Sequence, residues 1–187
     1  MKATKTRKAT AIFQAFTGFS YQETYAAEPR DIIRGMDGQP WISKNRQKTG
    51  FDESVPLLPI VKKIIEKYKG HPVNCRSGRL LPVPSNEYYN RCLKEIAGII
   101  NTRMLNNTHQ FRFFFANEVT FNQGVTLKTV SKMLGHRSVK TTEIYVRANK
   151  NNIAGNMQMV KGKLFDEQGN LKTKSQVTNI PVLKIVR

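Results

Sequence analysis

The sequence is poor in cysteine and histidine, which limits both disulfide bonding and metal binding. Of its 187 residues, two are cysteine and three are histidine. Cys75 and Cys92 lie far apart and neither belongs to a Cys-x-x-Cys pair. This spacing indicates neither a disulfide framework nor a zinc cluster. We therefore expect a reduced, cytoplasmic protein that uses no cofactor and no metal.

Long apolar runs are also missing from the sequence. No run approaches the roughly 18 residues that a membrane-spanning helix needs, and the N-terminus lacks the apolar core of a signal peptide. Hydrophobic residues nevertheless make up 39% of the chain, which is enough for a globular protein with a buried core. We expect one folded domain and no membrane partner.

Acidic residues are scarce compared with basic ones. The chain has 13 Asp and Glu against 31 Lys and Arg, which gives a formal net charge of +18. Such an excess favours a polyanionic partner, with nucleic acid as the first candidate and an anionic membrane surface as the second. The alternative is a basic protein whose charge serves only to keep it soluble.

Three short apolar runs separated by polar turns predict a small antiparallel sheet near the N-terminus. The turns contain Gly38 and Gly50, and the runs are residues 31–33, 40–43 and 53–57.

The rest of the chain has mainly helical periodicity. The basic stretch up to Lys8 is expected to fray. The expected helices are residues 12–16 ending at Gly18, one starting at Pro59, one capped by Ser85, one capped by Thr108 and running to Gly124, one from Thr126 to Gly135, and one capped by Ser138 that carries Tyr145. The fold class is therefore α+β, mostly α-helical with a three-stranded sheet. Residues 1–160 form the expected domain, and residues 161–187 a flexible or partner-docking tail.

His109 and Arg112 are the first candidates for chemistry. They lie three residues apart in the sequence, so their side chains project from one face of the expected helix. An arginine fork binds two phosphate oxygens, and a neighbouring imidazole can accept or relay a proton. Taken alone, the pair is more typical of a solvated helix surface.

Three further residues are candidates for chemistry when they are considered together with this pair. Tyr145 follows nine residues after His136, and a tyrosine nucleophile needs positive surroundings because its ordinary pKa is about 10. His136 follows Gly135 at an expected helix end, and Lys48 lies in a turn between two expected strands. The ordinary alternatives are a core tyrosine, a helix-terminal histidine and a solubilising lysine.

Together these segments resemble the tyrosine recombinases of the phage integrase family. Residues 124–136, followed by Ser138, Thr141, Thr142 and Tyr145, resemble the C-terminal signature of that family, and most closely its conjugative-transposon branch. Residues 109–112 resemble its His-x-x-Arg box, Lys48 its β-hairpin lysine, and residues 16–19 the start of its first arginine box. The similarity extends from about Ile12 to Met157.

The resemblance implies the fold of the recombinase catalytic domain and a mechanism of DNA cleavage and rejoining. Tyr145 would attack the scissile phosphate to form a 3′-phosphotyrosyl link, while Lys48 protonates the leaving 5′ oxygen. Arg112 would hold the non-bridging oxygens, His136 would hydrogen-bond the phosphate, and His109 would assist proton transfer from the tyrosine.

The resemblance also implies partners and a location. Double-stranded DNA is the expected substrate, and other recombinase subunits are expected to complete a tetramer on it, with a monomer in isolation. The protein is expected in the bacterial cytoplasm, associated with the nucleoid. The family's helical core-binding domain is not recognisable ahead of Ile12, so we expect either an excised fragment or a natural truncation.

Two positions depart from the family pattern and keep alternatives open. Ser20 stands where members usually carry an arginine, for which Arg30 or Arg7 is a candidate substitute, and Phe113 stands where histidine often follows the box. One alternative is a recombinase remnant that has lost activity. The other is a DNA-binding regulator that places residues 138–148 in the major groove as in a helix-turn-helix protein.

Overall fold

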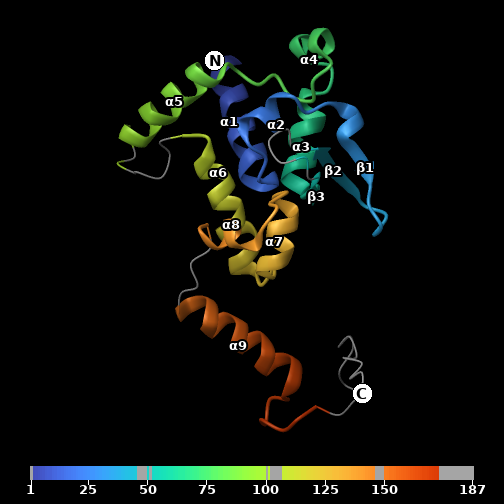
Figure 1. Cartoon of the computed structure of the whole chain (residues 1–187), viewed down its shortest axis with the longest axis vertical. Helices are drawn as coiled ribbons and strands as arrows, with labels where there is room; N and C mark the ends of the chain where they lie inside the picture. The colour runs from blue at the N-terminus through green and yellow to red at the C-terminus, as the bar shows by residue number, and fades with distance from the viewer. Residues whose placement is uncertain are drawn as a thin grey trace. The chain divides into compact units, whose positions relative to one another are not determined.

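A computed structural model describes residues 2–45, 50, 52–99, 101, 107–145 and 150–172 of the chain. The chain divides into two compact units, Met1–Arg147 and Ala148–Arg187. The first contains the sheet and helices α1 to α8, and the second contains helix α9 (Lys150–Leu164) (Figure 1). No helix of the described ranges is long and apolar enough to cross a membrane.

Helix α1 (Lys2–Thr17) packs into the core through residues such as Phe13, which is fully buried. The helix already begins at Lys2, so the expectation of a frayed start up to Lys8 is wrong. Its end is as predicted, because Gly18 has a left-handed φ of +74°. A Cβ atom at Gly18 would lie 2.5 Å from Cδ1 of Phe115, so both the backbone angle and the packing require glycine.

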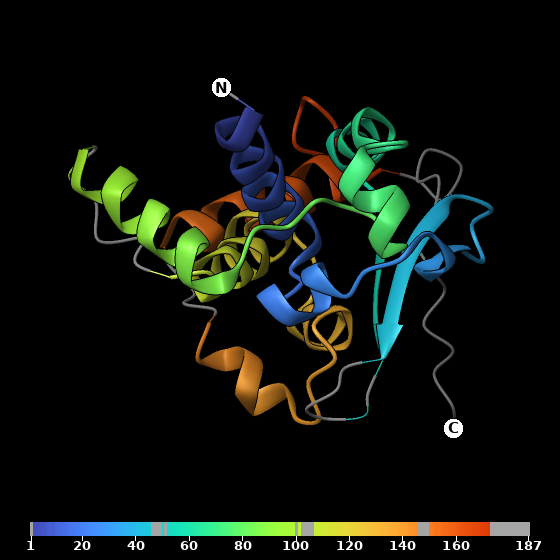
Figure 2. The same ribbon diagram turned by 90° about the horizontal axis from the view of Figure 1, so that it is seen from above.

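The predicted sheet is confirmed. Strands β1 (Ile32–Arg34), β2 (Pro40–Asn45) and β3 (Asp52–Pro56) pair antiparallel in that order. Ile42 of β2 faces Val55 of β3, and both side chains are buried. The sheet and helix α5 (Asn86–Ile99) lie on opposite sides of α1 (Figures 1 and 2).

Helices α3 (Pro59–Tyr68) and α5 follow the expected apolar stripes. Pro59 occupies the first turn of α3, where its missing N–H costs no hydrogen bond. On α5, Tyr89, Leu93 and Ala97 are buried, whereas Ile96 is 44% exposed. Three short elements were not predicted: α2 (Tyr21–Tyr25), the 3₁₀ turn η1 (Pro29–Asp31) and α4 (Pro72–Ser77).

The helix expected from Thr108 to Gly124 differs from the prediction. It consists of α6 (His109–Phe114), a π-helical turn η2 (Phe115–Thr120) and a 3₁₀ turn η3 (Phe121–Gln123). Thr108 does not cap it, because its backbone is already helical (φ −63°, ψ −22°) and its side chain makes no capping bond. The apolar pattern does not distinguish a π-turn from an α-helix, since both continue the same helical rod.

Helices α7 (Leu127–Met133) and α8 (Val139–Glu143) begin as predicted. The Thr126 side chain accepts from the Thr129 N–H, and the Ser138 side chain accepts from the Lys140 N–H. Tyr145 lies two residues beyond the end of α8 rather than on it. Residues 173–187 of the expected tail lie outside the described residues.

Candidate active site

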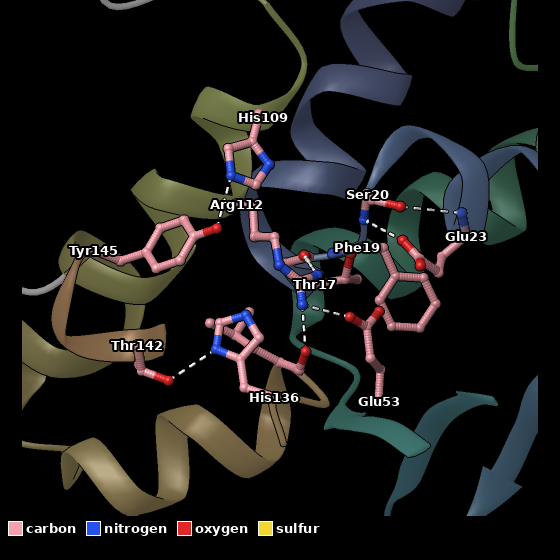
Figure 3. A network of polar contacts seen from close by, with 12 residues as sticks. Thr17, Phe19, Ser20, Glu23, Glu53, His109, Arg112, His136, Thr142 and Tyr145 are labelled. Atoms are coloured by element: carbon pink, nitrogen blue, oxygen red, sulfur yellow. Dashed lines mark hydrogen bonds and ion pairs between the residues drawn. The ribbon is translucent and has the colours of Figure 1, made fainter. Parts of the chain in front are cut away.

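Tyr145 and His109 are in direct contact. The Tyr145 hydroxyl lies 2.7 Å from Nε2 of His109, although 36 residues separate them in the sequence (Figure 3). His109 is exposed at the start of α6, and Tyr145 is half-buried in the turn after α8. The phenol oxygen is therefore placed where an imidazole can exchange a proton with it.

Two further rings surround the Tyr145 side chain. The His136 ring is stacked on it, with centroids 5.6 Å apart and an interplanar angle of 26°. The Phe113 ring lies 5.9 Å away at 48°. The ring of Tyr145 thus packs like that of a core residue, while its hydroxyl faces a histidine. A core tyrosine and a tyrosine nucleophile are therefore compatible interpretations of this residue.

His136 is fixed by a buried threonine. Its Nδ1 lies 2.8 Å from Oγ1 of Thr142, and the imidazole is only 9% exposed (Figure 3). Gly135 before it has a left-handed φ of +56°, which allows the sharp turn that directs the imidazole toward Tyr145.

Arg112 is fully buried and bound on several sides (Figure 3). Its Nη1 donates to the Gly18 carbonyl at 2.7 Å and its Nη2 to the Leu134 carbonyl. Nη2 also lies 2.5 Å from Oε1 of Glu53, which is itself fully buried. A buried guanidinium requires such a counter-charge, because the isolated ion would be strongly disfavoured away from water.

The turn at Gly18 explains how the end of α1 reaches this arginine. The Thr17 hydroxyl donates to the Phe13 carbonyl at 2.8 Å and accepts from the Phe19 N–H at 3.3 Å. These bonds hold the left-handed turn, which points the Gly18 carbonyl at Arg112.

The sequence model of the Phage integrase family matches residues 6–152, most of the chain. This range includes the His109–Tyr145 contact and both buried ends of the Arg112 ion pair. The chain belongs to the phage integrase family. Family membership therefore makes the Tyr145–His109 contact a candidate for catalysis.

One curated relative and several solved structures are similar to the chain. The tyrosine recombinase XerC of Rickettsia prowazekii (strain Madrid E) is 30% identical over 112 residues, which cover 54% of this chain and 35% of the relative. The XerH site-specific recombinase bound to its palindromic difH substrate has a TM-score of 0.63 at 18% identity, covering 82% of this chain and 45% of that one. The chain therefore spans less than half of either protein.

Two integrases share the fold at lower identity. The Tn1549 transposon integrase in complex with circular intermediate DNA gives a TM-score of 0.57 at 14% identity, covering 81% of this chain and 59% of that chain. The catalytic domain of bacteriophage HP1 integrase gives 0.56 at 16%, covering 80% and 79%. These likenesses confirm the predicted fold, mostly helical with a small antiparallel sheet.

Ser20, where integrases usually carry an arginine, caps helix α2. Its backbone N–H donates to Oε2 of Glu23 at 2.9 Å, and its hydroxyl accepts from the Glu23 N–H at 3.4 Å (Figure 3). The two candidate substitutes have other contacts: Arg30 pairs with Glu28 at 2.7 Å, and Arg7 donates to Sγ of Cys92 at 2.7 Å. The serine therefore has a structural role that the family pattern does not predict.

The predicted site residues fall into two sets. His109, Arg112, His136 and Tyr145 come together in the described part of the chain (Figure 3). Lys48 belongs to the segment joining β2 to β3 and lies outside the described residues, so its place in the site stays a prediction.

Sequence reasoning missed the residues that support this site. Glu53 has the one usable signal, because it shares the inward face of β3 with buried Val55, where an acidic residue is unexpected. Thr142 lies within the recognised signature but has no chemistry of its own to mark it. Asn117 follows the aromatic stretch after Arg112, and no motif in the sequence marks it as part of the site.

A second tyrosine near the site is structural. Tyr89 of α5 is only 1% exposed, and its ring stacks on that of Phe111 with the centroids 6.4 Å apart. Burial raises the pKa of its phenol far above the ordinary value, which keeps the group protonated. Tyr145, with its hydroxyl on an imidazole, is the better candidate for nucleophilic chemistry.

Proposed function

We propose that this chain is the catalytic part of a site-specific DNA recombinase that cuts and rejoins strands through Tyr145. The 2.7 Å contact between the Tyr145 hydroxyl and His109, beside the Arg112 guanidinium, carries the proposal. Family membership supports it, since the matched relatives are recombinases and integrases, among them XerH and Tn1549 integrase in complexes with DNA.

In the cleavage step, the Tyr145 oxygen attacks the scissile phosphorus and its proton passes to Nε2 of His109. The bond from phosphorus to the 5′ oxygen breaks, and Lys48 donates the proton that the leaving oxygen needs. The products are a 3′-phosphotyrosyl link and a free 5′-hydroxyl. Rejoining is the same step in reverse, so the bond energy is retained and no ATP is required.

Arg112 and His136 stabilise the charge that builds on the non-bridging oxygens. Nε of Arg112 makes no hydrogen bond within the described residues, so it is a donor available to a phosphate. Because the guanidinium is fully covered in the DNA-free chain, DNA binding must expose this edge before cleavage.

The partners and location follow from the same proposal. The net charge of +18 suits double-stranded DNA, and binding should weaken steeply as salt increases. We propose a monomer in isolation, a tetramer on paired DNA sites, and a place on the nucleoid in the bacterial cytoplasm. Tn1549 integrase among the fold relatives supports the conjugative-transposon branch.

The test is a nicked suicide duplex that carries the end sequence of the genetic element encoding the protein. Cleavage next to the nick releases a short strand, so a covalent protein–DNA adduct accumulates and survives denaturation. The proposal requires an adduct in the native chain and none in Tyr145→Phe. DNA binding without any adduct would instead favour the remnant or the regulator.

A further inference from the structure

We propose that Asn117 is a positioning residue that holds the backbone of Tyr145 in place for attack. The inference rests on the proposed function of Tyr145 and adds a residue that touches neither DNA nor the reacting atoms. Asn117 lies in the π-helical turn η2 and is only 7% exposed.

The Asn117 amide connects two parts of the site. Its Nδ2 donates to the Phe113 carbonyl at 3.0 Å and also to the Tyr145 carbonyl, which is 28 residues away in the sequence. An amide NH₂ group has two hydrogens, so both are used. One side chain thus joins the helix that carries His109 and Arg112 to the turn that carries Tyr145.

Tyr145 needs such a support because little secondary structure holds it. It lies beyond α8, a helix of only five residues, and helices this short have marginal stability of their own. The Tyr145 N–H donates to the Thr142 carbonyl at 2.9 Å. The Tyr145 carbonyl, which lies beyond the helix end, is the group that Asn117 binds.

The π-helical turn fixes the direction of the Asn117 side chain. Phe121 N–H donates to the Ala116 carbonyl five residues back, the spacing that defines a π-turn. The Thr120 hydroxyl donates to the carbonyls of Phe115 and Ala116 at 3.0 and 2.8 Å. These bonds hold the widened turn, and π-turns of this kind occur frequently at functional sites.

Tyr145 is therefore held to one helical rod at two points. Its hydroxyl contacts His109 on α6, and its carbonyl contacts Asn117, eight residues further along the chain, on η2. With both ends fixed, the phenol oxygen has a defined position before DNA arrives. Without Asn117, we expect the ring to keep its neighbours but the attacking oxygen to lose its defined position.

The first test compares Asn117→Asp and Asn117→Ala with Asn122→Asp. Asp at 117 keeps the shape but replaces the donor with a carboxylate, and Ala removes the side chain without adding charge. Asn122→Asp introduces the same charge on the same rod, at a side chain whose amide donates to Oε2 of Glu118 at 3.1 Å. Melting temperatures of all three variants establish that they fold.

We expect both Asn117 variants to form the adduct about 10- to 100-fold more slowly at saturating DNA, as misplacement of a reacting group does. Their dissociation constants for DNA should match that of Asn122→Asp, which should cleave at the native rate. A 5′-bridging sulfur at the scissile bond, which leaves without a proton donor, should rescue Lys48→Ala but neither Asn117 variant. Native cleavage rates in both Asn117 variants would overturn the proposal.

Hydrogen exchange supplies a readout that does not depend on activity. The backbone amides of residues 139–145 should exchange faster in Asn117→Asp and Asn117→Ala than in Asn122→Asp or the native chain. Unchanged exchange would overturn the positioning role. A native chain that forms no adduct but shows this exchange difference would refute the recombinase function alone, so the two proposals fail separately.

Discussion

The two halves of the site are built in opposite ways. Arg112 and its counter-charge Glu53 are fully buried, with partners from the end of α1 and the end of α7. Tyr145 and His109 lie near the surface, in a turn and at the first residue of a helix. The arginine half is thus part of the core, whereas the tyrosine half is attached to it by a few side-chain bonds.

This contrast fits what each half does in the proposed mechanism. A fixed positive charge is most effective where the surroundings are dry and do not reorganise. A nucleophile, by contrast, must meet a phosphate on a DNA duplex that is far too large to enter the core. We therefore expect substitutions in the arginine half to change stability first, and substitutions in the tyrosine half to change cleavage first.

Tyr145→Phe gives the largest expected effect. It removes the oxygen that forms the covalent link in the proposed mechanism while keeping the ring contacts with His136 and Phe113. The adduct on a suicide substrate should fall below detection. The melting temperature and DNA affinity should stay close to native, and a clear loss of stability would contradict the proposed separation between the halves.

His109→Ala should have the next largest effect on cleavage. The residue is exposed and accepts the tyrosine proton in the proposed mechanism, so adduct formation should slow about 100- to 10,000-fold. Single-turnover cleavage at saturating DNA measures this. Because His109 is exposed, urea unfolding should change little, and cleavage at the native rate would remove it from the mechanism.

Glu53→Ala tests the buried half. It leaves the Arg112 guanidinium without its counter-charge, which should reduce the free energy of unfolding by about 3–5 kcal/mol. Urea denaturation measures the loss. Asp52→Ala, at the exposed neighbouring position of β3, is the control and should lie within about 0.5 kcal/mol of native. Equal effects in the two variants would show that the ion pair contributes no stability.

Thr142→Val should have the smallest effect. It removes the hydroxyl 2.8 Å from Nδ1 of His136, a bond whose loss corresponds to roughly 1 kcal/mol, or about a fivefold slower cleavage. Thr141→Val, an exposed position one residue earlier, is the control. A native rate in Thr142→Val would mean that packing on Tyr145 alone orients the imidazole.

Local signals predicted much of this architecture, and distant contacts account for what they missed. The sheet, the left-handed end of α1 at Gly18, and the caps Thr126 and Ser138 depend on neighbouring residues, which a sequence displays directly. The ion pair of Glu53 with Arg112 joins segments 59 residues apart, and no periodicity encodes such a pairing.

The same distinction explains the outcome for the site itself. The family signature supplied Tyr145, His109, His136 and Arg112 as a set, and the described structure brings them together. It did not supply Asn117, and it included Thr142 without giving it a role, because these roles arise from a π-turn and a buried hydroxyl that depend on packing. Supporting residues of this kind can be recognised only once the backbone is known.

The capping role of Ser20 has an evolutionary consequence. In this chain the position that integrases usually give to an arginine closes the first turn of α2 together with Glu23. An arginine at this position would remove the side-chain cap, a loss of about 0.5–2 kcal/mol. Any replacement of Ser20 must therefore gain a stabilising contact that offsets the lost cap, which restricts how this position can change during evolution.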